Sequence, residues 1–285
     1  MKVVRTLIFI IFVTVGRVHA QEYTLYSNDI LVIDSEYLKE SIHLNIHLPE
    51  TFNFSSDSAK YPITIIFDSQ HERTYTQIIN SFDLLTNETQ VPETIIIGVP
   101  FNIRNRFYLT SNQRLDNDSI SGIERMERFL FSELIPKLQK DFKANNFISL
   151  IGHSRTAFLV NYLAYHRSKE INIAIALSGF YNEKPLSTDS FYSFLTDSDN
   201  FSQKFSYYYS AGTTFEETTY LSQYQKLDNL LSNSSLPENI SVHFEENQYA
   251  NHMTNYWISI PPILIDAFND YNAILDSWFH DILND

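Results

Sequence analysis

A serine that could act as a nucleophile lies within residues 147–160, FISLIGHSRTAFLV. The apolar start of this segment is typical of a buried strand, and a helical pattern follows Ser154. Gly152-His153-Ser154 therefore stands in a strand–turn–helix context, where a sharp turn would hold the serine hydroxyl above a sheet. A helix beginning after Ser154 would direct its free N–H groups toward charge that develops on a substrate oxygen. Position 156 is threonine, whereas the usual G-x-S-x-G motif has glycine there.

A serine nucleophile needs a base, and His252 is the preferred histidine. It follows an expected strand over 240–245 and lies in an expected loop ahead of a final helix. It also comes last in the order Ser…acid…His, which is the chain order of α/β-hydrolases. The alternative is that His252 is a solvated loop residue. His153 adjoins the nucleophile in a position that points elsewhere, so we expect it to be a packing residue.

The base needs an orienting carboxylate, which should follow the core strand that precedes the histidine. Residues 205–210 (FSYYYS) are the expected strand, and Gly212 and the pair Glu216 and Glu217 come after it. Either glutamate could serve. Glu216 is preferred because a helix over 218–231 would leave it free to point into the crevice, while Glu217 would face water. In the alternative, both acids only complement the dipole of that helix.

The elements that would position these residues alternate along the chain. Short apolar runs occupy residues 62–67, 94–99, 147–151 and 173–177, and such runs are typical of strands buried on both faces. Residues 37–48 alternate toward a further strand that ends at Pro49. Strand–helix alternation predicts an α/β protein with a mainly parallel central sheet and helices on both faces.

Two helical patterns and four glycines complete this picture. Apolar residues spaced by three and four run from Ile123 to Phe142, with Pro136 as a kink or an inner first turn. A second pattern, Trp257 to Leu283, predicts a helix after Pro261-Pro262. Glycines at or near strand ends mark where a parallel sheet forms its ligand crevice and where turns need permissive dihedrals. These are Gly98, Gly152, Gly179 and Gly212.

Composition excludes several kinds of chemistry. The formal net charge is −14, so the surface would repel phosphate backbones and anionic lipids, and no nucleic-acid partner is expected. The chain has no cysteine, which excludes disulfides, thiolate metal sites, iron–sulfur clusters and cysteine nucleophiles. No metal and no other cofactor is implied.

Residues 1–20 have the features of a secretory signal peptide. Basic residues precede an apolar run over 7–15, and Val18-His19-Ala20 resembles a small-residue cleavage site. The run is too short to span a bilayer, although an uncleaved anchor is the alternative. We expect cleavage before Gln21, a secreted or periplasmic protein without membrane insertion after cleavage, and a single domain over residues 21–285.

KYPITIIFDSQ, VPETIIIGVPFNIRNR and the segments around Ser154, Glu216 and His252 are spread over residues 35–252. Together they resemble the Putative esterase (esterase D-like) family of α/β-hydrolases, which includes feruloyl, acetyl-xylan and siderophore esterases and mycolyltransferases. KYPITIIFDSQ is similar to the family's "YPV-x-Y-x-LDG" segment, and VPETIIIGVPFNIRNR to its "P-x-x-IVVGI…R-x-R" stretch. RFLFSELIPKLQKDF, IGHS, YYYSAGTTFEE and ENQYANHM match later regions. The resemblance implies the α/β-hydrolase fold and a serine esterase that acts on a small-molecule or carbohydrate ester.

Carried over residue by residue, the resemblance implies a nucleophile at Ser154, a base at His252 and an acid at Glu216. It also implies an oxyanion hole of two backbone N–H groups. One belongs to Arg155, and the other follows Asp68, at Ser69 or Gln70, of which Gln70 is preferred. The expected reaction is a two-step acyl transfer through an acyl-enzyme.

Three departures from the family pattern leave the substrate open. The family's G-H-S-x-G-G is G-H-S-Arg-Thr-Ala here, its D-G pair is Asp68-Ser69, and Phe107 follows Arg106 where the family often has aspartate. No catalytic group is lost. The altered serine turn nevertheless motivates an alternative function, a non-catalytic protein on the same fold that binds a polysaccharide or a siderophore.

Residues 181–204 separate two expected core strands and resemble an insertion over the crevice. Their aromatic side chains could line a pocket for an acyl or sugar group, or could equally cover core surface. These residues are Tyr181, Phe191, Tyr192 and Phe194.

Overall fold

The computed structural model describes residues 29–56, 58–115, 118–184 and 186–284, except for the side chains of residues 270 and 272–284. The expected signal peptide over residues 1–20 lies outside the described residues. Within the described part of the chain, no helix combines the length and the apolar character needed to cross a membrane.

Eight strands form one sheet in the order β1-β2-β4-β3-β5-β6-β7-β8. The pairs β1–β2 and β2–β4 are antiparallel, and every pair from β4 to β8 is parallel. The mainly parallel sheet is therefore confirmed, while β1 is a strand that the sequence pattern did not predict. The strands are β1 (Asp29–Ser35), β2 (Glu40–His47), β3 (Tyr61–Phe67), β4 (Ile95–Val99), β5 (Ala144–His153), β6 (Ile173–Leu177), β7 (Phe205–Gly212) and β8 (Ile240–Asn247).

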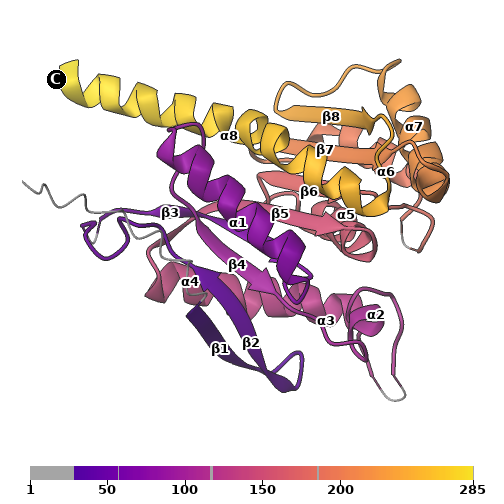
Figure 1. Ribbon diagram of the computed structural model, residues 1–285, viewed down its shortest axis with the longest axis horizontal. Helices are drawn as coiled ribbons and strands as arrows, with labels where there is room; N and C mark the ends of the chain where they lie inside the picture. Colours follow the sequence, from indigo (N-terminus) through magenta and orange to yellow (C-terminus); the bar gives the residue numbers. More distant parts are fainter. Residues whose placement is uncertain (1–28, 57, 116–117, 185, 285) are drawn as a thin grey trace, which may run out of the picture.

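Helices cover both faces of the sheet (Figure 1). Every residue of β3, β4 and β6 is buried, which explains why these strands are continuous apolar runs rather than alternating ones. α1 (Glu72–Asn87) and α8 (His252–Asn284) pack on one face. The other face carries α3 (Gly122–Arg128), α4 (Ile135–Asp141), α5 (Arg155–Arg167), α6 (Thr188–Thr196) and α7 (Thr218–Leu231), with the short α2 (Arg106–Leu109) nearby.

The helix expected from Ile123 to Phe142 is present but is not uniform. α3 continues into a π-helical segment, Phe129–Leu134, which is followed by α4. Pro136 lies in the first turn of α4, where a missing N–H is tolerated, so it marks an inner turn of the helix.

The expected start of the last helix is wrong. α8 begins at His252 and continues through Pro261 and Pro262. Pro261 has no N–H to donate to the carbonyl of Trp257, and Gln77 Nε2 of α1 donates to that carbonyl instead, at 2.9 Å. This hydrogen bond satisfies the carbonyl that Pro261 leaves without a helical donor, and it ties α8 to α1. His252 is consequently a helix-start residue rather than a loop residue.

The order of strands places a crevice at the ends of β3 and β5. β3 lies between β4 and β5, so the chain leaves β3 toward one side of the sheet and β5 continues on the other. Ligands of open α/β sheets bind at such a switch point, outside the carboxyl ends of the strands. Asp68 follows β3 there and Ser154 follows β5.

Candidate active site

Ser154 occupies a strained turn between β5 and α5. Its φ of 58° and ψ of −119° are unusual for a residue with a side chain, and its N–H donates to the carbonyl of Leu177 at 2.9 Å. The strand–turn–helix geometry expected for Ser154 is therefore present. A side chain at Gly152 would place its Cβ 2.3 Å from the carbonyl oxygen of Thr156, so this position needs glycine for space.

Dihedral freedom is not why the described glycines lie at strand ends, because none of them has a positive φ. That part of the sequence interpretation is wrong. Positive φ values are found instead at three non-glycine residues that follow strands: Asp68, Ser154 and Ser178. Residues held in such conformations cluster at functional sites.

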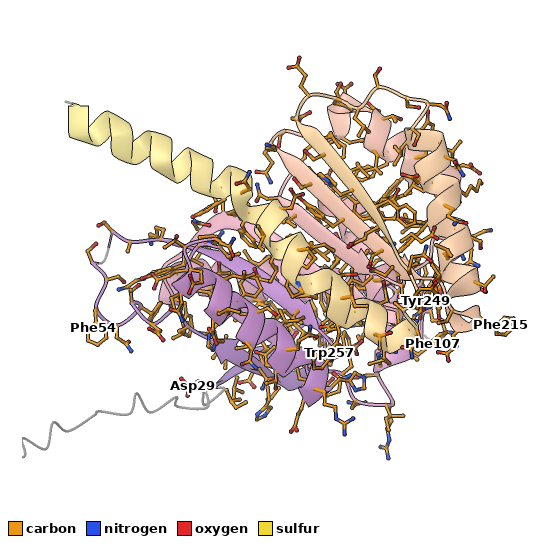
Figure 2. The ribbon with its side chains drawn as sticks, turned by 45° about the horizontal axis from the view of Figure 1, so that its top comes forward. Asp29, Phe54, Phe107, Phe215, Tyr249 and Trp257 are labelled. Carbon is orange, nitrogen blue, oxygen red and sulfur yellow. The ribbon has the colours of Figure 1, made fainter. Side chains whose placement is uncertain are left out.

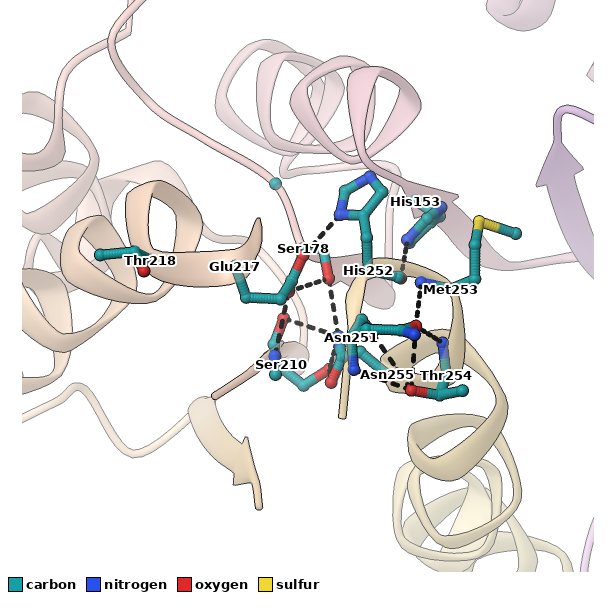
Figure 3. Close-up of polar contacts among 12 residues, drawn as sticks. His153, Ser178, Ser210, Glu217, Thr218, Asn251, His252, Met253, Thr254 and Asn255 are labelled. Carbon is teal, nitrogen blue, oxygen red and sulfur yellow. Dashed lines mark hydrogen bonds and ion pairs between the residues drawn. The ribbon is translucent and has the colours of Figure 1, made fainter. Parts of the chain in front are cut away.

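The carboxylate beside His252 belongs to Glu217, not to Glu216. Glu217 is fully buried, and its Oε1 lies 2.5 Å from His252 Nδ1 (Figure 3). Glu216 is exposed to solvent. The reason is a 3₁₀ turn over Phe215–Glu217, closed by a hydrogen bond from Glu217 N–H to the carbonyl of Thr214 at 2.9 Å. With three residues per turn, neighbouring side chains point in different directions, so only one of the two glutamates can face the crevice.

Glu217 is held as an anion by its hydrogen bonds. Its Oε2 accepts from Ser178 Oγ at 2.6 Å and from Gly212 N–H at 3.0 Å. Burial alone would raise the pKa of Glu217, but hydrogen bonds from His252, Ser178 and Gly212 outweigh burial and hold that pKa below its usual value. A carboxylate here accepts the Nδ1 proton of His252 and leaves Nε2 free to act as a base.

His252 is fixed from both sides and along its backbone. Its ring stacks on Tyr220, with centroids 4.9 Å apart, and lies 4.5 Å from the ring of His153. His153 Nε2 is 2.8 Å from the carbonyl oxygen of His252. Burial and the neighbouring His252 lower the pKa of His153 to about 4, so His153 is neutral near pH 7 and donates to that carbonyl. His153, which the sequence predicted to be a packing residue, therefore also fixes the start of α8.

A buried polar cluster joins α8 to the sheet below His252 (Figure 3). Asn255 Nδ2 donates to Ser178 Oγ at 2.8 Å and to the carbonyl of Ser210 at 3.2 Å. Asn247 Nδ2 donates to Asn255 Oδ1 at 2.7 Å. Ser178 and Asn255 are two residues of this cluster that were not predicted from the sequence. A polar residue directly after a buried strand, as Ser178 is after β6, was the available signal.

Ser154 and His252 line one cavity of about 930 Å³. The Ser154 hydroxyl has no hydrogen-bond partner among the described residues, and such contacts often tighten only when substrate is bound. The cavity walls come mainly from residues 67–74, 101–107 and 252–256. Figure 2 shows the exposed rings of Phe107, Phe215 and Tyr249 at the end of the sheet to which the arrow of β8 points.

Both residues preferred for the oxyanion hole line this cavity. Ser69 N–H donates to the carbonyl of Val99 at 3.3 Å, whereas the backbone N–H of Gln70 has no partner in the described part of the chain. Arg155 is the first residue of α5, so its N–H has no intrahelical acceptor. The geometry thus favours Gln70 over Ser69.

The aromatic side chains of the segment over residues 181–204 cover the core rather than the crevice. Tyr181, Phe191 and Phe194 are buried and pack against one another, and Tyr192 is half-buried. None of the four lines the 930 Å³ cavity. Among the described residues of this segment, Glu183 contacts the site through an ion pair with Arg155.

Two of the three departures from the family pattern are accommodated by neighbouring residues. Ser69 Oγ donates to Asn45 Oδ1 at 2.9 Å, and Gly98 leaves room for its side chain, because a Cβ at Gly98 would lie 2.7 Å from Ser69 Cβ. The ring of Phe107 has its centroid 4.7 Å from the Arg155 guanidinium carbon, so the phenylalanine forms a cation–π pair with this arginine.

A family model described as "Putative esterase" matches residues 35–260 of the chain. No curated protein matches the chain.

Solved structures with the same fold share little sequence with the chain. An uncharacterised protein from Capnocytophaga ochracea has a TM-score of 0.70 and 16% identity, over 84% of this chain and 63% of that protein. The chain therefore spans less than two thirds of the length of that protein. An IroE-like serine hydrolase from Shewanella oneidensis has a TM-score of 0.71 and 18% identity, over 86% of this chain and 81% of the hydrolase. The siderophore hydrolase EstB from Aspergillus nidulans has a TM-score of 0.68 and 13% identity, over 87% of this chain and 97% of EstB. These likenesses show an α/β-hydrolase fold.

Proposed function

Because the chain belongs to the Putative esterase family, we propose that it is a serine esterase that cleaves carboxylic esters through an acyl-enzyme on Ser154. One observation carries the proposal. The buried Glu217 carboxylate holds His252 Nδ1 at 2.5 Å, and His252 and the strained Ser154 line the same cavity. A nucleophile, a base and an orienting acid are the parts that acyl transfer needs.

In the proposed reaction, His252 Nε2 takes the Ser154 hydroxyl proton as the serine oxygen attacks the ester carbonyl. The N–H groups of Gln70 and Arg155 stabilise the oxyanion of the tetrahedral intermediate. His252 returns the proton to the departing alkoxide, which leaves an acyl-serine. Water, deprotonated by His252, then attacks the acyl carbon, and the carboxylic acid departs as Ser154 regains its proton. Glu217 stabilises the imidazolium in both steps.

The proposed substrate is a small-molecule or carbohydrate ester. A cavity of about 930 Å³ has room for more than a short aryl ester, and its wall contains apolar Ile103, Phe107 and Met253. Two structures with this fold are described as a ferulic acid esterase and a siderophore hydrolase. Features of residues 1–20 support secretion, and mass spectrometry of the secreted chain, with Gln21 at its start, tests this part of the proposal.

Substitution of the nucleophile is the decisive experiment. We expect Ser154→Ala to lower kcat/KM for short-chain aryl esters by about 10⁴-fold or more, because nucleophile and base act as a unit. His252→Ala should be about as inactive, and the double variant little worse. Ser193→Ala, at an exposed serine on α6, is the control and should keep full activity.

Two results would count against the proposal. A Ser154→Ala variant within threefold of wild type would exclude the serine mechanism. Wild-type protein that cleaves none of a panel of aryl, feruloyl, acetylated-sugar and catecholate esters, yet binds a polysaccharide or a siderophore, would favour the non-catalytic alternative.

A further inference from the structure

We propose that Thr156 is a positioning residue whose hydroxyl, hydrogen-bonded to Asp68 across the crevice, fixes the two oxyanion-stabilising N–H groups relative to each other. The inference rests on the proposed ester hydrolysis and adds a role for the threonine that replaces the family's glycine at position 156. Glycine, the usual residue at position 156, has no side chain and cannot form this bond.

The hydrogen bond joins the two loops that carry the proposed oxyanion donors. Thr156 Oγ1 lies 3.0 Å from Asp68 Oδ2, and both residues are buried. Thr156 directly follows Arg155, and Asp68 precedes Gln70 by two residues. The bond therefore spans the gap between the two donors, although its partners are 88 residues apart in the chain.

Asp68 is a firm anchor for this bond. Arg106 donates to both of its carboxylate oxygens, from Nε at 2.7 Å and from Nη2 at 2.6 Å. Burial would raise the pKa of Asp68. The hydrogen bonds and the positive charge of Arg106, together with hydrogen bonds from Gln70 and Thr156, outweigh burial and hold that pKa below its usual value. The residue is therefore a carboxylate at neutral pH. Its φ of 65° is a strained conformation, which persists only where surrounding contacts determine it.

The Gln70 side chain links the position of Asp68 to that of the Gln70 backbone N–H. Its Nε2 donates to Asp68 Oδ1 at 2.8 Å, and its Oε1 accepts from the backbone N–H of Phe101 at 2.8 Å. With the side chain held at both ends, the backbone N–H of Gln70 is left for a ligand. Movement of Asp68 would displace this N–H.

The Thr156 hydroxyl has one proton and two possible acceptors. The carbonyl oxygen of His153 is also 3.0 Å away, and the N–H of His153 donates to Thr156 Oγ1 at 3.1 Å. A carboxylate is the stronger acceptor, because hydrogen bonds to charged groups are shorter and stronger than neutral ones. The hydroxyl thus accepts from the serine turn and donates to the oxyanion loop, which links the two directly.

Hydroxyl deletion with preserved shape tests the inference. Thr156→Val removes the hydrogen bond, Thr156→Ser restores it, and Thr156→Ala is a second, smaller deletion. Thr64→Val is the matched control, because Thr64 on β3 is also fully buried but its hydroxyl has no partner among the described residues. The readouts are kcat and KM for an aryl acetate, the Ki of an alkyl boronic acid that mimics the tetrahedral intermediate, and Tm.

We expect Thr156→Val and Thr156→Ala to lower kcat by about 10- to 100-fold, somewhat less than the loss of an oxyanion donor, with KM within threefold of wild type. The Ki of the boronic acid should rise by a similar factor, because only the tetrahedral state uses both N–H groups. Thr156→Ser and Thr64→Val should remain within threefold of wild type in all three constants.

Other outcomes would overturn the inference in distinguishable ways. A Thr156→Val protein with wild-type kcat and Ki would refute the positioning role and leave ester hydrolysis intact. A kcat loss that Thr156→Ser does not rescue, or one that follows a fall in Tm, would assign Thr156 to stability instead. Wild-type protein without esterase activity would refute the proposed function and this inference together.

Discussion

At the scale of single residues, the site depends on which of two adjacent glutamates is buried. Glu217 has three hydrogen-bond partners, the His252 ring, the Ser178 hydroxyl and the Gly212 N–H. Glu216 is exposed one position earlier. Their chemistry is identical, so any functional difference between them must come from the turn that orients them.

Glu217→Gln should therefore lower kcat by about 100-fold or more, because the imidazolium of His252 loses its charged partner. Glu216→Gln, the matched control on the adjacent residue, should keep kcat within twofold of wild type. Steady-state kinetics of the two variants with an aryl ester measure this difference. Equal losses, or a larger loss at Glu216, would contradict the orientation of the pair.

At the scale of elements, His153 connects the end of β5 with the start of α8. Its Nε2 donates to the His252 carbonyl oxygen, and burial together with the neighbouring His252 lowers the pKa of His153 from 6.5 to about 4. Between pH 4 and pH 6.5, this histidine binds a proton in the unfolded chain but not in the folded chain. The contribution of a neutral His153 to stability is therefore present above pH 6.5 and is lost as the pH falls toward 4.

We expect the free energy of unfolding of the wild type to fall between pH 6.5 and pH 4 more steeply than that of His153→Gln. The extra slope is at most about 1.4 kcal/mol per pH unit, the value for one proton. Urea titrations at pH 7, 6 and 5 measure it, with His43→Gln, at an exposed histidine on β2, as the control. Parallel curves for wild type and His153→Gln would show that His153 is not the titrating group.

At the scale of the whole molecule, α8 belongs to the fold along its first half and extends beyond the sheet along its second (Figure 1). Phe268 is fully buried in the layer between α1, α8 and the sheet. Its ring centroid lies 5.9 Å from those of Phe82 and Phe147. The part of the helix that supports His252 is therefore also the part that closes this layer.

Phe268→Ala should lower the free energy of unfolding by about 3–5 kcal/mol, because it leaves a cavity in a closed aromatic cluster. Deletion of residues 272–285, which include the turns that project past the sheet, should change Tm by no more than a few degrees and leave kcat/KM unchanged. Denaturant titration and thermal unfolding of the two variants provide the comparison. A deletion that unfolds the protein would show that the projecting turns contribute to the core.

The layers of the fold and two residues of the candidate site could be predicted from the sequence alone. β3, β4 and β6 could be predicted because strands buried on both faces need continuous apolar residues, which is a local pattern. The turn at Ser154 could be predicted because a strand, a crowded glycine and a helix follow one another directly in the chain. His252 could be assigned from chain order, since the fold fixes the order in which strand ends contribute residues.

The acid beside His252, the start of α8 and the bond between Thr156 and Asp68 could be identified only from the folded structure. Glu217 rather than Glu216 faces His252 because a single 3₁₀ turn orients them, and both residues fit the same sequence pattern. α8 begins at His252 and runs through two prolines, and the Trp257 carbonyl that Pro261 leaves without a helical donor accepts from Gln77, 180 residues away. The bond between Thr156 and Asp68 likewise joins distant segments. Such contacts arise from the packing of segments that are far apart in the chain, and local periodicity carries no information about them.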